Sequence, residues 1–219
     1  GTPSFLINLM IDRNYEVDSI PLKLNELYFS SYDVEDLSLT PILLQTGYLT
    51  IKDYDPERML YTLDYPNYEV KNSFLHYFER KLTKRDFPDA VLYDIVDSFQ
   101  KDNLEGAIDN LRTVFRGIEY DLHIPQEKYY QTLFYLVFTM MGLKIQTEVK
   151  TNIGRIDAVI ESRSVYIFEF KFSGTKEEAL AQIKNKKYYE KYINKGKDVF
   201  LVGAEFRDRN IGDYAVEKI

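Results

Sequence analysis

The sequence of 219 residues contains no cysteine, and this absence excludes disulfide bonds and thiolate metal sites. It has only two histidines, His76 and His123, so a zinc site built from imidazole groups is not expected. Neither a G-x-S-x-G motif nor a phosphate-binding GxxxxGK[ST] loop occurs. We therefore expect neither a serine-hydrolase triad nor ATP binding by this chain.

Long apolar runs are also missing. The longest, residues 133–143, is shorter than the roughly 20 residues that cross a bilayer, and Thr139 and Gly142 interrupt it. No signal peptide is visible, so we expect no membrane association and a cytoplasmic location. Because the chain opens with Gly1 and not with Met, we expect it to begin within a longer protein.

Positive charge is scarce overall, with a net charge of −7, but the deficit is confined to one half. Residues 1–119 carry 12 basic and 21 acidic side chains, whereas residues 120–219 carry 16 basic and 14 acidic ones. In the second half six lysines face only Glu190 and Asp198, and they are Lys184, Lys186, Lys187, Lys191, Lys195 and Lys197. This cluster can neutralise the phosphates of a nucleic acid, or it can form a solvated helix face.

The hydrophobic periodicity predicts an α/β chain in three parts. Residues 1–85 are predicted as a mostly helical, winged-helix-like segment with a β-hairpin, and residues 86–119 as a helical connector broken at Asp102-Asn103. Residues 120–219 are predicted as a mixed α/β part. The predicted helices cover residues 4–13, 39–44, 69–81, 125–141 and 175–192, with a further helix start at 30–33. The predicted strands cover residues 48–51, 59–63, 144–150, 156–160, 165–172, 198–203 and 214–219, with a turn at 53–58.

One constellation carries chemistry. Asp157 follows Gly154-Arg155-Ile156 in one apolar strand, and Glu169-Phe170-Lys171 ends the next strand, twelve positions later. The polar residues 161–164 between them are typical of a hairpin turn. Because side chains alternate along a strand, Glu169 and Lys171 share a face, and Asp157 can join them from the neighbouring strand.

Two carboxylates and a lysine inside apolar strands are costly to bury unless they have a role. The carboxylates can hold a hard cation such as Mg²⁺ or Mn²⁺, and the lysine can orient a water, an arrangement that suits phosphodiester hydrolysis. The alternative is a buried ion pair of Lys171 with Glu169 or Asp157. Short patterns of this kind are common by chance, but Gly154, the hairpin and the lysine-rich helix that follows favour the metal site.

These residues resemble the PD-(D/E)XK nuclease superfamily, in particular the branch found at the C-terminus of bacterial AAA-ATPase-like proteins, as in Bacteroidetes. The stretches that carry the resemblance are residues 154–157, 169–171 and 182–184. The resemblance to the nuclease covers roughly residues 120–219. Stretches 45–51 and 65–70 resemble the region between ATPase and nuclease in the same family. The resemblance implies a restriction-endonuclease-like fold, in which helices flank a mixed sheet with an α-β-β-β-α-β core.

By this resemblance Asp157 and Glu169 are metal ligands, helped by the carbonyl of Phe170, and Lys171 is the catalytic lysine. Glu127 matches an acid that the helix before the first core strand often supplies, and Gln182 matches a frequent active-site glutamine. Ile156 replaces the proline of the family name. The implied partners are nucleic acid, with DNA favoured over RNA, and an ATPase domain outside this chain; a homo-oligomer is a further expectation.

Several alternatives stay open at this point. Glu127 also suits simple stabilisation of a helix start, and Gln182 also suits a solvated face. Arg155 shares a face with Asp157 and can contact either a phosphate or an acid. Glu148 can add another acid to the site. For the whole chain, the rivals to a nuclease are a nucleic-acid-binding module with weak or no cleavage and a protein-interaction domain.

Overall fold

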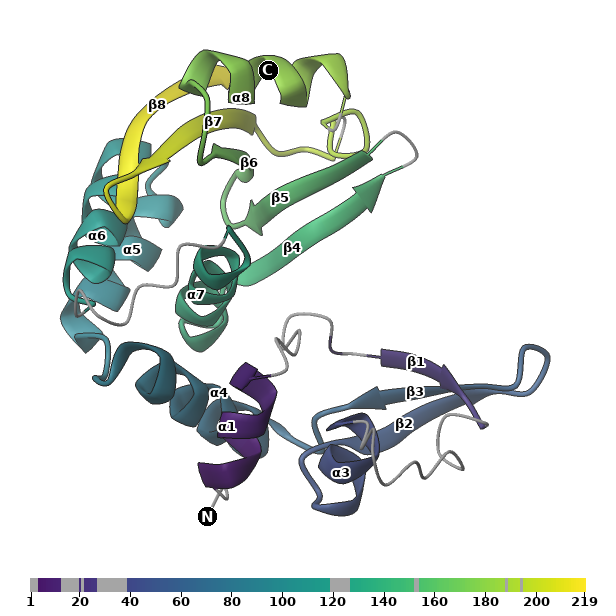
Figure 1. The fold of residues 1–219 in the computed structure, drawn as a ribbon. Coiled ribbons are helices and arrows are strands. Elements are labelled where there is room, and N and C mark those ends of the chain that lie inside the picture. Colours follow the sequence, from purple (N-terminus) through teal and green to yellow (C-terminus); the bar gives the residue numbers. More distant parts are fainter. Residues whose placement is uncertain are drawn as a thin grey trace. The chain divides into compact units, whose positions relative to one another are not determined.

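The computed structural model describes residues 4–12, 20, 22–26, 39–118, 127–151, 154–187, 189–193 and 195–219 (Figure 1). Within the elements, only the backbone is described at residues 5, 12, 127–131, 144, 146–151 and 154–156. The chain divides into two compact units, residues 1–82 and 83–219. None of the described helices has the length and apolar character needed to cross a membrane.

The first unit combines helices with a small antiparallel sheet. Its elements are α1 (Ser4–Asp12), β1 (Leu22–Asn25), α3 (Leu39–Gln45), β2 (Thr50–Asp55), β3 (Leu60–Asp64) and α4 (Tyr68–Thr83). The strand order is β1-β3-β2, and β3 pairs antiparallel with both neighbours. Helix, hairpin and helix follow one another as predicted, and the first strand lies beside the third, so the segment is winged-helix-like.

Two details of this unit differ from the sequence-based expectation. Strand β1 was not predicted, because four residues are too few to show a strand period against the helical signals around them. The predicted turn at 53–58 is shorter, since β2 continues to Asp55 and Met59 turns the chain in a left-handed conformation with φ 52°. The predicted helix start at 30–33 lies outside the described residues.

The second unit is built on a five-stranded mixed sheet. Its elements are α5 (Asp89–Gln100), α6 (Leu104–Arg116), α7 (Glu127–Met140), β4 (Lys144–Thr151), β5 (Gly154–Glu161), β6 (Val165–Lys171), α8 (Lys176–Asn185), β7 (Val199–Arg207) and β8 (Asn210–Lys218). The strand order is β4-β5-β6-β7-β8, with β6 and β7 parallel and the other pairs antiparallel. The order α7-β4-β5-β6-α8-β7 is the predicted α-β-β-β-α-β core, so the restriction-endonuclease-like fold is confirmed.

Helices α5, α6 and α7 cover one face of this sheet with aromatic side chains. Phe99 of α5 packs on Tyr166 of β6 at 4.9 Å between ring centroids, and Phe115 of α6 packs on Phe206 of β7 at 5.4 Å. Phe134 of α7 lies 4.8 Å from Phe170. Residues 86–118 of the predicted connector thus belong to the second unit.

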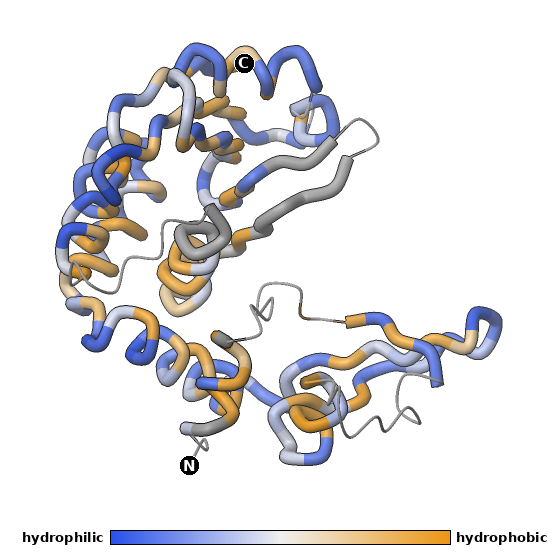
Figure 2. Tube along the Cα trace, in the orientation of Figure 1, coloured by the Kyte–Doolittle hydropathy of each residue, from blue (hydrophilic) through white to orange (hydrophobic). Residues whose placement is uncertain are grey.

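Helix α8 covers the other face. A hydrophobic core lies between the sheet and this helix. It contains Ile183 of α8, Tyr192 beyond the helix, and the strand residues Val159, Val165, Ile167, Val199 and Leu201. The alternation of side chains along β6 therefore sends its phenylalanines to one layer and Glu169 to the other, as the sequence predicts. In Figure 2 hydrophobic colour gathers on the central strands and on helix sides near them, while α8 and the turns after it are mostly hydrophilic.

The α8 helix is shorter than the predicted span 175–192. It ends at Asn185, Lys186 caps it by donating its backbone N–H to the carbonyl of Gln182, and Lys187 takes a left-handed φ of 50°. The chain then proceeds through turns that bring Tyr192 into the core beside Val165 and Val199. Burial of this tyrosine therefore overrides the helical pattern, and the lysine-rich helix of the prediction is only partly a helix.

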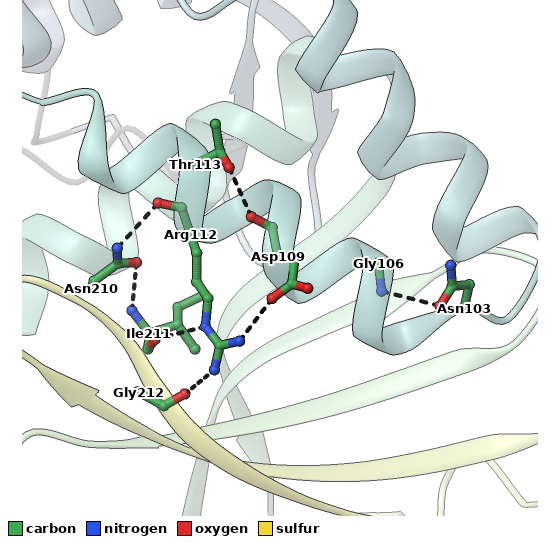
Figure 3. Close-up of polar contacts among 8 residues, drawn as sticks. All are labelled: Asn103, Gly106, Asp109, Arg112, Thr113, Asn210, Ile211 and Gly212. Atoms are coloured by element: carbon green, nitrogen blue, oxygen red, sulfur yellow. Dashed lines mark hydrogen bonds and ion pairs between the residues drawn. The ribbon is translucent and has the colours of Figure 1, made fainter.

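An arginine on α6 ties that helix to the start of β8 (Figure 3). Arg112 donates from Nε to the carbonyl of Ile211 at 3.0 Å and from Nη2 to the carbonyl of Gly212 at 2.5 Å. Its Nη1 pairs with Asp109 Oδ1 at 2.8 Å, and Asn210 Nδ2 donates back to the carbonyl of Arg112 at 3.1 Å. Arg112 thus donates hydrogen bonds to two backbone carbonyls of the edge strand β8.

Candidate active site

Asp157 lies where the pairing of β5 with β6 ends. The backbone register runs from Glu161 opposite Val165 to Ala158 opposite Phe168, so Asp157 is the next residue along β5. There the backbone N–H of Phe170 donates to Asp157 Oδ2 at 2.7 Å. The carboxylate is buried, with 9% of its residue exposed, and this hydrogen bond fixes it beside the strand that carries Glu169.

Glu169, Lys171 and Gln182 form a contiguous polar group. Gln182 on α8 donates from Nε2 to Glu169 Oε1, and its Oε1 accepts a hydrogen bond from Lys171 Nζ at 2.6 Å. Lys171 Nζ also lies 3.8 Å from Glu169 Oε1. Glu169 is 3% exposed, whereas a quarter of the Lys171 side chain reaches solvent. The amide of Gln182 therefore bridges the acid and the amine on the face covered by α8.

The sequence explains where α8 begins and how closely it packs on these strands. Thr175 and Glu178 form a capping box: Glu178 N–H donates to Thr175 Oγ1 at 3.2 Å, and Glu178 Oε2 accepts from Thr175 N–H at 3.0 Å. Gly203 of β7 lies against the helix backbone, because a Cβ there would come within 2.3 Å of the carbonyl oxygen of Lys176. The helix can therefore approach the sheet closely enough for Gln182 to reach both partners.

A third buried acid lies on the strand next to Lys171, and the sequence patterns did not predict it. Glu205 of β7 is opposite Lys171 in the parallel register and only 8% exposed. The predicted strand stopped at Gly203, so the alternation that places Glu205 on the same face was not followed to its end. If the predicted strand had been extended by two residues, the alternation of side chains would have placed Glu205 on this face.

Other predicted site residues are placed only in part. Glu127 begins α7, Glu148 lies in β4 and Arg155 lies in β5, but their side chains are outside the described residues. The ring of Phe170 packs on the helix face of the sheet, while its carbonyl belongs to the strand backbone next to Glu169. The roles predicted for these residues stay predictions.

The lysines predicted to bind nucleic acid are exposed, and two of them have acidic partners. Lys184 Nζ lies 2.9 Å from Glu217 Oε2 of β8, and Lys187 Nζ lies 3.5 Å from Glu190 Oε1. Lys186 is exposed at the end of α8. These ion pairs do not prevent the lysines from contacting phosphate, because exposed ion pairs are weak and can exchange partners. Phosphate binding by these lysines stays a prediction.

The donor set fits a hard divalent cation. Asp157 and Glu169 supply carboxylate oxygens on adjacent strands, and Phe170 supplies a backbone carbonyl between Glu169 and Lys171. Oxygen ligands of this kind are the ones that Mg²⁺ and Mn²⁺ prefer. The low exposure of both acids also favours a counter-charge near them, because ionised carboxylates are costly to bury alone.

The fold and this polar group define the second unit as a restriction-endonuclease-like α/β domain. A model of the PD-(D/E)XK nuclease superfamily matches residues 125–212. These residues therefore form a domain of the PD-(D/E)XK nuclease superfamily, which supports a nuclease-type function, and nucleases of this superfamily generally use divalent metal ions.

A relative in Azotobacter chroococcum mcd 1 is described as an uncharacterized protein in the vnfD 5′ region. It is 31% identical over an alignment of 240 positions. That alignment covers the whole of this chain but only 45% of the relative, so the chain spans less than half the relative's length.

Proposed function

We propose that the second unit is a Mg²⁺-dependent nuclease that hydrolyses phosphodiester bonds, with DNA rather than RNA as the substrate. The observation that carries the proposal is the bridge made by Gln182 between buried Glu169 and Lys171, beside Asp157. If Lys171 and Glu169 formed only a structural ion pair, they would not need the side-chain amide of Gln182 on α8 between them. The choice of DNA follows from the resemblance to restriction-endonuclease-like domains.

In this proposal Asp157, Glu169 and the carbonyl of Phe170 hold the cation, and Glu127 of α7 assists them. When bound, the cation supplies Lewis-acid polarisation of the scissile phosphate. Lys171 orients the attacking water and offsets the negative charge that develops on the phosphate. Gln182 holds the ammonium group of Lys171 through its Oε1 at 2.6 Å, so the amine keeps a fixed position beside Glu169.

Substrate contacts outside the reacting atoms are proposed for one arginine of β5 and for lysines of α8 and the turn after it. Arg155, Lys184, Lys186 and Lys187 are the candidates, and neutralising phosphates would make binding weaken as salt rises. Because the relative is more than twice as long as this chain, we also propose a further domain, of the AAA-ATPase-like type. Assembly into a homo-oligomer is a separate proposal for the whole protein.

The test is cleavage of supercoiled plasmid and of labelled single-stranded, branched and RNA substrates, with Mg²⁺, Mn²⁺ or EDTA. We expect metal-dependent cleavage of DNA that Lys171→Ala reduces by about 100-fold or more, because it removes charge stabilisation at the reacting phosphate. The matched control is Lys101→Ala, which removes an exposed lysine paired with Asp97 and should leave cleavage unchanged.

Two other outcomes would contradict the proposal. No cleavage by either protein, with DNA retained in a salt-sensitive manner, would identify a nucleic-acid-binding module. No cleavage, no DNA binding and no metal binding would leave Asp157, Glu169 and Lys171 as a buried ion-pair network in a protein-interaction domain.

A further inference from the structure

Glu205 is a buried carboxylate that the proposed function does not use. It lies on β7, on the face that α8 covers, and 8% of the residue is exposed. The pairing of β7 with β8 shifts between Ala204 and Phe206, so Glu205 of β7 is opposite two residues of β8, Gly212 and Asp213. Such irregularities of a strand ladder are frequent beside active sites.

The contacts of Glu205 hold the first turn of α8. Its Oε1 accepts the backbone N–H of Lys176 at 3.2 Å, and Lys176 is the first residue of the helix. Its Oε2 pairs with Arg207 Nε at 2.9 Å. A carboxylate at the N-terminus of a helix is favoured both by the unpaired N–H groups there and by the helix dipole.

The same strand also sets how closely α8 approaches. Gly203 is two residues before Glu205 and opposite Glu169 in the parallel register. A Cβ at Gly203 would lie 2.4 Å from the backbone nitrogen of Leu180, which is closer than a real side chain allows. On one face of β7, Gly203 therefore sets the distance between α8 and the sheet, and Glu205 holds the N-terminal end of α8.

This anchoring reaches the polar group through the helix itself. Gln182 lies six residues after Lys176, a separation of about 9 Å along an α-helix. It touches Glu169 with one amide atom and Lys171 with the other. A tilt of α8 that follows release of its first turn would break this double contact, because both hydrogen bonds of Gln182 depend on one helix position.

We infer that Glu205 is a positioning residue for phosphodiester cleavage: it holds the N-terminus of α8 so that Gln182 keeps Lys171 beside Glu169. The inference rests on the proposed function. Glu205 acts through the helix and not on the substrate, so its loss lowers kcat and leaves KM for the nucleic acid unchanged.

The experiment compares wild type with Glu205→Ala and Glu205→Gln in Mg²⁺-dependent cleavage. We expect Glu205→Ala to lower kcat by about 10- to 100-fold at unchanged KM, since small displacements of a catalytic group have effects of this size. Glu205→Gln keeps an oxygen that can accept the N–H of Lys176, and we expect it to restore most of the rate. Hydrogen exchange of residues 176–185, measured without metal, should rise in Glu205→Ala and return toward wild type in Glu205→Gln.

The matched control is Glu178→Ala, which removes the capping-box carboxylate of the same helix without touching β7. It should weaken α8 locally yet keep kcat within about twofold of wild type, since it leaves the tie to β7 in place. If Glu205→Ala cleaves like wild type, or if Glu178→Ala loses as much kcat as Glu205→Ala, the positioning role is wrong although the proposed function stands. If wild type does not cleave at all, the proposed function fails and the inference fails with it.

Discussion

The carboxylate of Asp157 shows how one residue can serve both fold and chemistry. One of its oxygens accepts the N–H of Phe170, which completes the hydrogen bonding of β6 where the ladder with β5 ends. Glu169 has a comparable second task in its contact with Gln182. Conservative changes at these acids should therefore separate charge from hydrogen bonding.

We predict that Asp157→Asn folds normally but loses metal affinity. The amide keeps an oxygen that can accept the N–H of Phe170, so the free energy of unfolding should change by no more than about 1 kcal/mol. The lost negative charge should weaken Mn²⁺ binding by about tenfold or more, because a charged ligand of a hard cation is gone. Titration calorimetry with Mn²⁺ measures the affinity, and urea denaturation measures the stability.

Asp97→Asn is the control for this prediction, because Asp97 pairs with Lys101 at an exposed site on α5. Unchanged Mn²⁺ affinity in this variant is expected. Equal Mn²⁺ affinity in wild type and Asp157→Asn would remove Asp157 from the proposed set of ligands.

At the scale of elements, the α6–β8 contact of Arg112 joins a helix to an edge strand nearly a hundred residues away (Figure 3). Three polar groups of one side chain are used, two of them on backbone carbonyls of Ile211 and Gly212. Both hydrogen bonds lie in a partly buried position, so we expect the arginine to stabilise the start of β8.

We predict that Arg112→Ala lowers the free energy of unfolding by about 1–3 kcal/mol, because it leaves carbonyls of Ile211 and Gly212 without their donor. Arg116→Ala, on the exposed side of the same helix, should change stability by less than about 0.5 kcal/mol. Urea denaturation of both variants, followed by circular dichroism, compares them directly. Equal effects would show that the arginine contributes only helix propensity or charge.

The sequence predicted most elements of the second unit because their signals are local. The alternating residues of β5 and β6 and the polar turn between them define the hairpin, and with it the shared face of Glu169 and Lys171. The end of α8 was missed because Tyr192 packs in the core with Val199 and with Val165, and Val165 is distant in the sequence. Glu205 was missed because the predicted strand stopped at Gly203, and its place opposite Lys171 follows only from the parallel register of β6 with β7.

At the scale of the whole molecule, alkaline stability should depend on a buried tyrosine. Burial first, and the nearby carboxylate of Glu161 second, raise the pKa of Tyr192 from 10.0 to about 12. Between these values the unfolded chain has lost a proton that the folded chain keeps. The free energy of unfolding therefore falls as pH rises from 10 to 12, whereas below pH 10 this contribution is fully present.

We predict that Tyr192→Phe makes this fall less steep. Among the described residues the hydroxyl of Tyr192 has no hydrogen-bond partner, so at pH 7 the variant should be within about 1 kcal/mol of wild type or more stable. Urea denaturation at a series of pH values from 7 to 12 gives both slopes. Tyr93→Phe, at an exposed tyrosine, is the control; identical slopes for all three proteins would contradict the prediction.

The parallel pairing of β6 with β7 determines when the candidate site can assemble during synthesis of the chain. Antiparallel β5 and β6 meet through a short turn, whereas Val165 meets Val199 only after the whole crossover through α8 has been synthesised. A chain emerging from the ribosome thus contains Asp157, Glu169, Lys171 and Gln182 before β7 exists to seat the helix. Under the proposed function, we expect a nascent chain to cleave nucleic acid only after β7 has been made and α8 packs on it.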